Sequence, residues 1–266
     1  MSAPGEIVNS NPELGLIVKN VCEIQKIVNV AVLLDATGSM GHEIQAAAET
    51  MVSNIQKLKS MYPNCVFKVG LVVYRDYDEE NEFVIRDFTD NVESIVAILT
   101  QEPASGGGDI SENVAGGLAN IFNLSWEGDV CQVFWVADAP AHGDLYHDIT
   151  VSDNHRDGDR NGLDPRELMQ RLAKRNIGVS FFKMNSTTDK MISVLDVAYQ
   201  SGRVPGNKAN FIIADVSEQL KSAKSHFVPY HDFGLDRPPA MELFTSPSAE
   251  AYQEQFLAAV SSQLDA

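Results

Sequence analysis

The sequence predicts an α/β fold in which a doubly wound, mostly parallel six-stranded sheet carries helices on both faces. Three observations support this fold class. Short runs of β-branched and apolar residues recur along the chain, beginning with residues 28–35. Stretches with apolar residues at helical spacing separate most of these runs. Two of the runs stop abruptly on a carboxylate, at Asp35 and at Asp138. Ligands of open α/β sheets bind at such carboxyl ends of strands.

The elements follow from these patterns in chain order. After the strand at 28–35, a helix is expected over 41–60, because Met51, Ile55 and Leu58 recur on one face. The other strands are expected over 66–74, 83–88, 130–137, 177–183 and 210–215. The other helices are expected over 92–99, 112–122, 166–175, 188–199 and 248–264.

Two of these elements need a separate argument. The strand at 83–88 is predicted to be an antiparallel edge strand, because only the short charged turn 76–81 precedes it. The last helix carries an apolar stripe with a period of four, which includes Val260 and Leu264. Most such stripes face the core of their own domain, so docking on this domain is the expectation and binding to a partner is the alternative.

Composition excludes several classes of function. The chain has 266 residues, 44% of them hydrophobic, and a formal net charge of −17. This charge argues against nucleic acid or an anionic membrane as a direct partner. No apolar run approaches the roughly 20 residues of a membrane span, and no signal peptide is evident. Three widely spaced cysteines predict free thiols and a cytoplasmic location.

The first strand predicts a metal site. Asp35 ends it, and Thr37 and Ser39 follow at alternate positions, so that a carboxylate and two hydroxyls cluster at the strand end. These hard oxygen donors suit Mg²⁺, Mn²⁺ or Ca²⁺. A flexible loop at 106–109 precedes the next helix, and Asp138 ends the neighbouring strand. The three segments are expected to surround one point at the switch of strand order.

This arrangement resembles the von Willebrand factor A (VWA) domain and its metal-ion-dependent adhesion site, known as MIDAS. That family uses Asp-x-Ser/Thr-x-Ser after the first strand, a threonine from a second loop and an aspartate after the fourth strand. The first motif matches here at residues 35–39, and the last matches at Asp138. The resemblance implies a Rossmann-like VWA domain over 26–224, with an N-terminal extension at 1–25 and a C-terminal extension at 225–266.

Within this family, the sequence is most similar to the A domains of atypical alpha-kinase proteins. The likeness rests on Asp-Ala-Thr-Gly-Ser-Met from Asp35, Gly-Gly-Gly-Asp at 106–109 and Ala-Asp-Ala-Pro-Ala-His-Gly at 137–143. It implies a non-enzymatic module without catalytic residues, which binds Mg²⁺, or Ca²⁺ or Mn²⁺, and recognises a protein partner. The partner could place an acidic side chain in the metal shell. The second-loop threonine is not obvious, and Asp109 is favoured over Ser111 for its place.

The long acidic loop after Asp138 carries two weaker signals. Asp157, Asp159 and Asn161 copy the start of an EF-hand calcium loop, but Leu168 stands where the twelfth-position glutamate belongs. A solvated loop is therefore favoured over a calcium-binding one. A zinc site of His142, His147, His155 and Asp138 fits no standard spacing, so His142 is expected to shape the metal loop instead. These histidines and loop residues complete the candidate set.

Three other functions compete with a metal-dependent binding module. A structural or assembly subunit that binds its partner without metal is the first alternative. A phosphoryl-transfer enzyme with Asp35 as nucleophile is less favoured, because the aspartate expected two positions later is absent. Kinase activity is not expected, because the segment beyond Asp215 has no glycine-rich phosphate loop and is too short for a catalytic domain.

Overall fold

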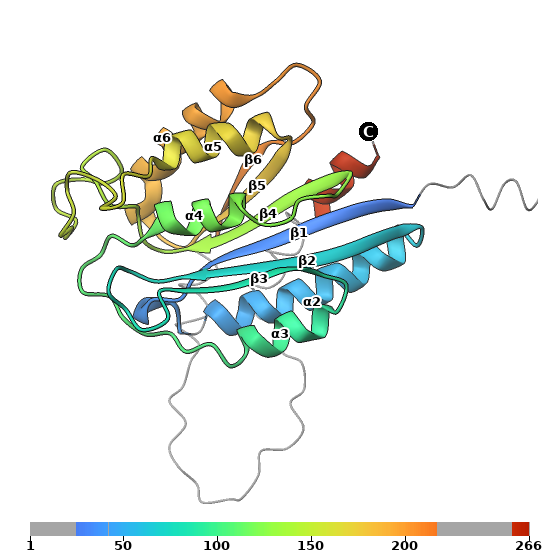
Figure 1. The fold of residues 1–266 in the computed structure, drawn as a ribbon, viewed down its shortest axis with the longest axis horizontal. Helices are drawn as coiled ribbons and strands as arrows, with labels where there is room; N and C mark the ends of the chain where they lie inside the picture. The colour runs from blue at the N-terminus through green and yellow to red at the C-terminus, as the bar shows by residue number, and fades with distance from the viewer. Residues whose placement is uncertain (1–24, 42, 217–256, 266) are drawn as a thin grey trace, which may run out of the picture.

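A single six-stranded sheet forms the centre of the molecule, with strand order β3-β2-β1-β4-β5-β6 (Figure 1). The structure is a computed structural model, and it describes residues 25–41, 43–216 and 257–265. Every pair of neighbouring strands is parallel except β2 and β3, which are antiparallel. The predicted doubly wound sheet with one antiparallel edge strand is therefore confirmed.

The elements follow the predicted order. The strands are β1 (Lys26–Asp35), β2 (Cys65–Tyr74), β3 (Phe83–Thr89), β4 (Val130–Ala137), β5 (Ile177–Lys183) and β6 (Phe211–Asp215). The helices are α2 (Glu43–Met61), α3 (Val92–Leu99), α4 (Val114–Phe122), α5 (Pro165–Lys174) and α6 (Asp189–Gly202). Two short 3-10 helices, η1 (Gly38–Met40) and η2 (Ser186–Thr188), complete the set. The 3-10 turn η1 stands before α2, in a segment for which no element was predicted.

Both faces of the sheet are covered by helices. Helices α2 and α3 lie on one face, and α4, α5 and α6 lie on the other (Figure 1). Within β1, Val30, Val32 and Leu34 face the first layer, whereas Ala31 and Leu33 face the second. This alternation is the two-residue period of a strand that is buried on both sides.

The C-terminal segment packs on this domain where the structure describes it. Residues 257–264 are helical, and Val260 and Leu264 are buried in the core on the α2 side. The Gln263 amide donates a hydrogen bond to Gln132 Oε1 of β4 over 2.9 Å. Docking on its own domain is thus observed for these residues, while the stripe's first half, Tyr252 and Phe256, lies outside the described residues.

Two further predictions concern the cysteines and membrane-spanning helices. Cys65 and Cys131 are both free thiols, as predicted, and Cys22 lies outside the described residues. Among residues 25–41, 43–216 and 257–265, no helix combines the length and the apolar character that crossing a bilayer requires.

Candidate metal centre

Asp35 ends β1 in a fully buried position, 0% exposed. The backbone N–H and the hydroxyl of Thr37 both donate to Asp35 Oδ1, over 3.0 and 2.6 Å. The other oxygen, Asp35 Oδ2, is buried without a hydrogen-bond partner. Ser39 lies two residues further on, exposed on η1. The predicted carboxylate and the Thr37 hydroxyl therefore come together at the end of β1, with one carboxylate oxygen unused.

Glu112, just before α4, is an acidic residue of this centre that the sequence analysis missed. Its side chain is buried, with the residue 3% exposed, and its Oε2 has no hydrogen-bond partner. The Thr37 side chain acts on this carboxyl group as well, which links Glu112 to the end of β1. Burial and then the negative charges of Asp35, Asp76 and Asp109 raise the pKa of Glu112 to about 10. The Glu112 carboxyl group thus lies in the electrostatic field of several other carboxylates.

The electrostatics of Asp35 include Asp138 as well. Burial is the largest cause that raises the pKa of Asp35 to about 7, and the charge of Asp138 after β4 is the second. Strands β1 and β4 are parallel neighbours, so their carboxyl ends lie at the same edge of the sheet. We call Asp35, Thr37, Glu112 and Asp138 the first cluster. The charge of Asp35 thus acts on Glu112, and the charge of Asp138 acts on Asp35.

The glycine-rich loop closes over this edge. Gly106 and Gly107 have φ of +90° and +99°, a region that favours glycine. A Cβ on Gly106 would lie 2.4 Å from the carboxyl carbon of Glu79, whose Oε1 accepts a hydrogen bond from Gly107 N. On its other side, the Gly106 carbonyl accepts a hydrogen bond from Gly38 N. The positive φ angles therefore favour glycine at both positions where the loop approaches η1.

Arg75 fixes the segment that leads into this loop. Its guanidinium is 1% exposed and pairs with Glu102 Oε1 over 2.6 Å. The same guanidinium donates to the Pro103 carbonyl over 2.7 Å and to Ser105 Oγ over 3.2 Å. Ser105 N in turn donates to the carbonyl of Ala36, next to Asp35. Arg75 therefore holds the second loop against the end of β1.

Replacing Arg75 by methionine should lower the free energy of unfolding by about 3–5 kcal/mol, because Glu102 loses its buried partner and two loop hydrogen bonds are lost. Urea denaturation followed by circular dichroism measures this change. Arg86→Met is the matched control, because Arg86 is exposed on β3 and bonds only to the neighbouring carbonyl of Ile85. An equal effect of the two substitutions would contradict this role of Arg75.

Beside the first cluster lies a network of histidines and aspartates. His142 Nε2 lies 2.8 Å from Asp76 Oδ1, and His142 Nδ1 lies 2.7 Å from Asp153 Oδ1. His147 Nε2 lies 2.8 Å from Asp153 Oδ2. Asp153 also accepts hydrogen bonds from two backbone N–H groups, and all these donors hold its pKa well below the usual range despite its burial. The contacts of His142 with both aspartates raise its pKa against the effect of burial.

Asp109, which was predicted for the same site as Asp35, lies close to two other acidic or imidazole side chains. Asp109 lies with Asp76 and His142, and one ligand atom of each of the three lies within 4.8 Å of the other two. Glu112 is instead the acidic residue of the second loop that contacts Thr37. Asp109 therefore belongs to a neighbouring group, although its charge still acts on Glu112.

The EF-hand-like segment is organised by its own backbone. Asp159 Oδ2 accepts hydrogen bonds from Asn161 N and Leu163 N over 2.8 and 2.9 Å. Asp159 Oδ1 accepts a hydrogen bond from the Tyr77 hydroxyl. Asp157 and Asn161 are exposed. These contacts are those of a solvated, self-capped loop, which is the interpretation that the sequence favours.

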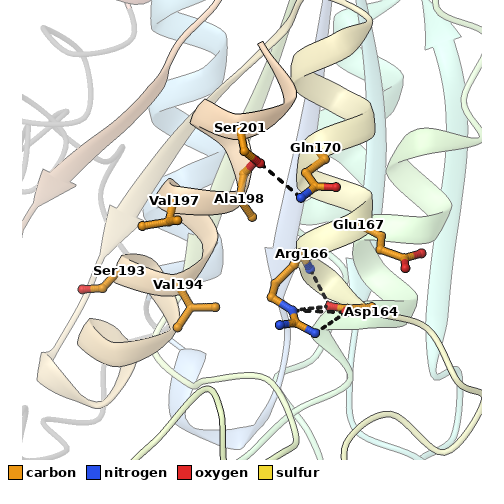
Figure 2. A pocket seen from close by; sticks show the side chains of 9 residues that line it. All are labelled: Asp164, Arg166, Glu167, Gln170, Ser193, Val194, Val197, Ala198 and Ser201. Carbon is orange, nitrogen blue, oxygen red and sulfur yellow. Dashed lines mark hydrogen bonds and ion pairs between the residues drawn. The ribbon is translucent and has the colours of Figure 1, made fainter.

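A groove lies between α5 and α6, and its lining residues belong to neither of these two groups. Figure 2 shows it, with Gln170 and Ser201 hydrogen-bonded across it over 3.1 Å. Its one arginine, Arg166, is paired with Asp164 over 2.7 Å. Its remaining wall is formed mainly by small and apolar side chains of α6. This combination does not offer the convergent charged groups found at the carboxyl ends of β1 and β4.

Comparison with known proteins agrees with the topology and the motifs. Residues 29–156 match the family model of the von Willebrand factor A domain. Over these residues, the chain is similar to VWA domains. Its similarity to the alpha-protein kinase vwkA of Dictyostelium discoideum is 27% identity over 226 residues, which cover 84% of this chain and 35% of vwkA. The predicted relation of this chain to alpha-kinase proteins is thereby confirmed.

Two further proteins are similar to parts of this chain. The putative ariadne-like RING finger protein R811 of Acanthamoeba polyphaga mimivirus is 28% identical over 159 residues, which are 58% of this chain and 15% of R811. The vWF domain of the pilus tip protein Mfa5 of Porphyromonas gingivalis has a TM-score of 0.45 and 13% identity, covering 76% of this chain and 94% of that one. The chain thus spans about a third of vwkA and a smaller part of R811.

Proposed function

We propose that this VWA domain binds a divalent cation, Mg²⁺ by preference, and recognises a protein partner through it without catalysing a reaction. The proposed ligands are Asp35, Thr37, Ser39, Glu112 and Asp138. Glu112 takes the second-loop place for which Asp109 was favoured from sequence. A cytoplasmic location is part of the same proposal.

One observation carries the proposal. Asp35 Oδ2 and Glu112 Oε2 are both buried and lack hydrogen-bond partners, although each belongs to a carboxylate whose pKa is raised. Buried carboxylates normally have partners, and unpaired ones are costly. A hard cation would satisfy both oxygens and offset the repulsion among the carboxylates. The all-oxygen donor set fits Mg²⁺, Mn²⁺ or Ca²⁺.

The residues divide the work of holding such an ion. Asp35 accepts two hydrogen bonds from Thr37, which orient its free oxygen and place the Thr37 hydroxyl beside Glu112. The exposed Ser39 and the glycine loop stand on the open side, where a partner could approach. When bound, the ion supplies a positive charge that can coordinate an oxygen atom of a partner's side chain. Complete burial of Asp35 favours this role over that of a phosphorylated nucleophile.

The first test is calorimetric titration of Mg²⁺, Mn²⁺ and Ca²⁺ into EDTA-stripped protein. The wild type should show saturable binding, and Asp35→Asn should lose it. Asp90→Asn is the matched control, because Asp90 is an exposed aspartate after β3. Absence of saturable binding in the wild type at millimolar ion would overturn the proposal.

The second test separates a metal-dependent module from a metal-independent assembly subunit. Proteins retained on the immobilised domain are compared in Mg²⁺ and in EDTA, for the wild type and for Asp35→Asn. Loss of the same partner in EDTA and in the variant supports recognition through the ion. Equal retention in all arms would favour the assembly subunit.

A further inference from the structure

The proposed function does not use the group formed by Asp76, Asp109 and His142, which we call the second cluster. Its members come from three segments: Asp76 follows β2, Asp109 ends the glycine-rich loop and His142 follows β4. One oxygen or nitrogen atom of each lies within 4.8 Å of those of the other two. The loops that carry them gather at the same end of the sheet in Figure 1. The fold thus brings an imidazole and two carboxylates from distant parts of the chain to one point.

The second cluster has the supporting contacts of a built site. His142 Nδ1 is held by Asp153 Oδ1, and the Asp153 side chain is completely buried. Asp153 is itself fixed by His147 and by the backbone N–H groups of Gly143 and His155. The Tyr77 ring stacks on His142 at 4.8 Å between centroids. A carboxylate behind the imidazole fixes the ring and makes its other nitrogen a better ligand.

Each of the two clusters contains a buried oxygen without a hydrogen-bond partner. Asp109 Oδ1 and Glu112 Oε2 both lack hydrogen-bond partners, and Glu112 is 3% exposed. The charges of Asp35 on one side, and of Asp76 and Asp109 on the other, all act on Glu112. Glu112 therefore belongs to the surroundings of both clusters. One cation in the first cluster would leave the oxygen of Asp109 uncompensated.

We propose that Asp76, Asp109 and His142 form a second divalent-cation site, distinct from the first cluster and suited to a borderline ion such as Zn²⁺ or Co²⁺. One imidazole nitrogen and two carboxylates form a donor set that such ions accept, whereas Mg²⁺ prefers oxygen alone. The short contact between His142 Nε2 and Asp76 Oδ1 marks a proton between two prospective ligands. Metal binding releases that proton to solvent and leaves both atoms as ligands.

The test loads the first cluster with saturating Mg²⁺ and then titrates Zn²⁺ into the chelator-stripped full chain by calorimetry. One additional equivalent of Zn²⁺ should bind to the wild type. It should be lost in His142→Gln and in Asp109→Asn. Asp109→Asn preserves the oxygen that accepts the hydrogen bond from Asn154 N, so it decides the matter if His142→Gln fails to fold. In ¹⁵N-histidine spectra, the Nε2 resonance of His142 should shift as Zn²⁺ is added.

The matched control is His155→Gln, because His155 packs against Tyr77 and His142 but is not part of the cluster. This variant and Asp35→Asn should both retain the Zn²⁺ equivalent. The proposal is overturned if the wild type binds no such equivalent, or if Asp109→Asn retains it. A Zn²⁺ equivalent lost in Asp35→Asn and kept in Asp109→Asn would place the ion in the first cluster and overturn the second site.

Discussion

Asp35→Asn should stabilise the metal-free domain and at the same time remove its stabilisation by Mg²⁺. The fold holds Asp35 among other carboxylates, and its pKa is raised to about 7 by burial and by Asp138. At neutral pH, this raised pKa costs the metal-free fold a few kcal/mol, since each unit corresponds to about 1.4 kcal/mol. Asparagine keeps the oxygen that accepts both hydrogen bonds from Thr37 and carries no charge. Thermal unfolding in EDTA should therefore show a higher Tm for the variant.

Added Mg²⁺ should reverse this order. An ion at a hundredfold excess over its Kd stabilises the wild type by about 2.7 kcal/mol, or roughly 5–10 °C in Tm for a domain of this size. The variant should gain nothing. A parallel rise of Tm in both proteins would contradict the role of Asp35, and Asp90→Asn should follow the wild type.

The same raised pKa gives a pH dependence with a definite sign. The folded pKa of Asp35, about 7, lies above the unfolded value of 3.8, so the folded state binds the proton more tightly. Stability of the metal-free protein should therefore fall as pH rises from about 4 to about 7. Asp35→Asn should flatten this decline, which urea denaturation across that range measures.

The fold could be predicted from sequence because its signals are local and repeated. The residues of β4 are all buried and alternate between the two cores. A strand that is buried on both faces is typically encoded by a continuous apolar run. Pro165 marks the start of α5, where Asp164 caps the helix. The 3-10 turn η1 between β1 and α2 was not predicted, because Gly38 in this turn contacts the distant glycine-rich loop.

The candidate site could be predicted only where strand ends fix it. Asp35 and Asp138 follow directly from β1 and β4, whose neighbouring positions the topology determines. Glu112 depends on the path of a loop with positive φ at two glycines, and no periodicity encodes that path. A usable signal was present, because Glu112 directly precedes the helix cap Asn113, at the end of the helix that faces the sheet edge. Asp153 was also missed, since its role appears only when the long loop folds back on His142.

Glu112→Thr should lower the affinity of the site for Mg²⁺ and raise the affinity of the Mg²⁺-loaded site for an acidic ligand. Removing one buried carboxylate next to the ion takes away a Coulomb attraction in a weakly screened position. We expect Mg²⁺ affinity to fall tenfold to a hundredfold, about 1.4–2.8 kcal/mol. Titration of Mg²⁺ by calorimetry measures this loss, and Glu127→Thr, at an exposed glutamate, is the control.

The gain for an acidic ligand follows from charge. With Asp35, Glu112 and Asp138 around it, a divalent ion leaves a net negative site, which disfavours a further carboxylate. With threonine at position 112 the site becomes neutral, so a glutamate-containing peptide should bind the Mg²⁺-loaded variant more tightly than the Mg²⁺-loaded wild type. Unchanged Mg²⁺ affinity would remove Glu112 from the ligand set. Weaker Mg²⁺ binding without tighter peptide binding would mean that the partner meets the domain through contacts other than a carboxylate on the ion.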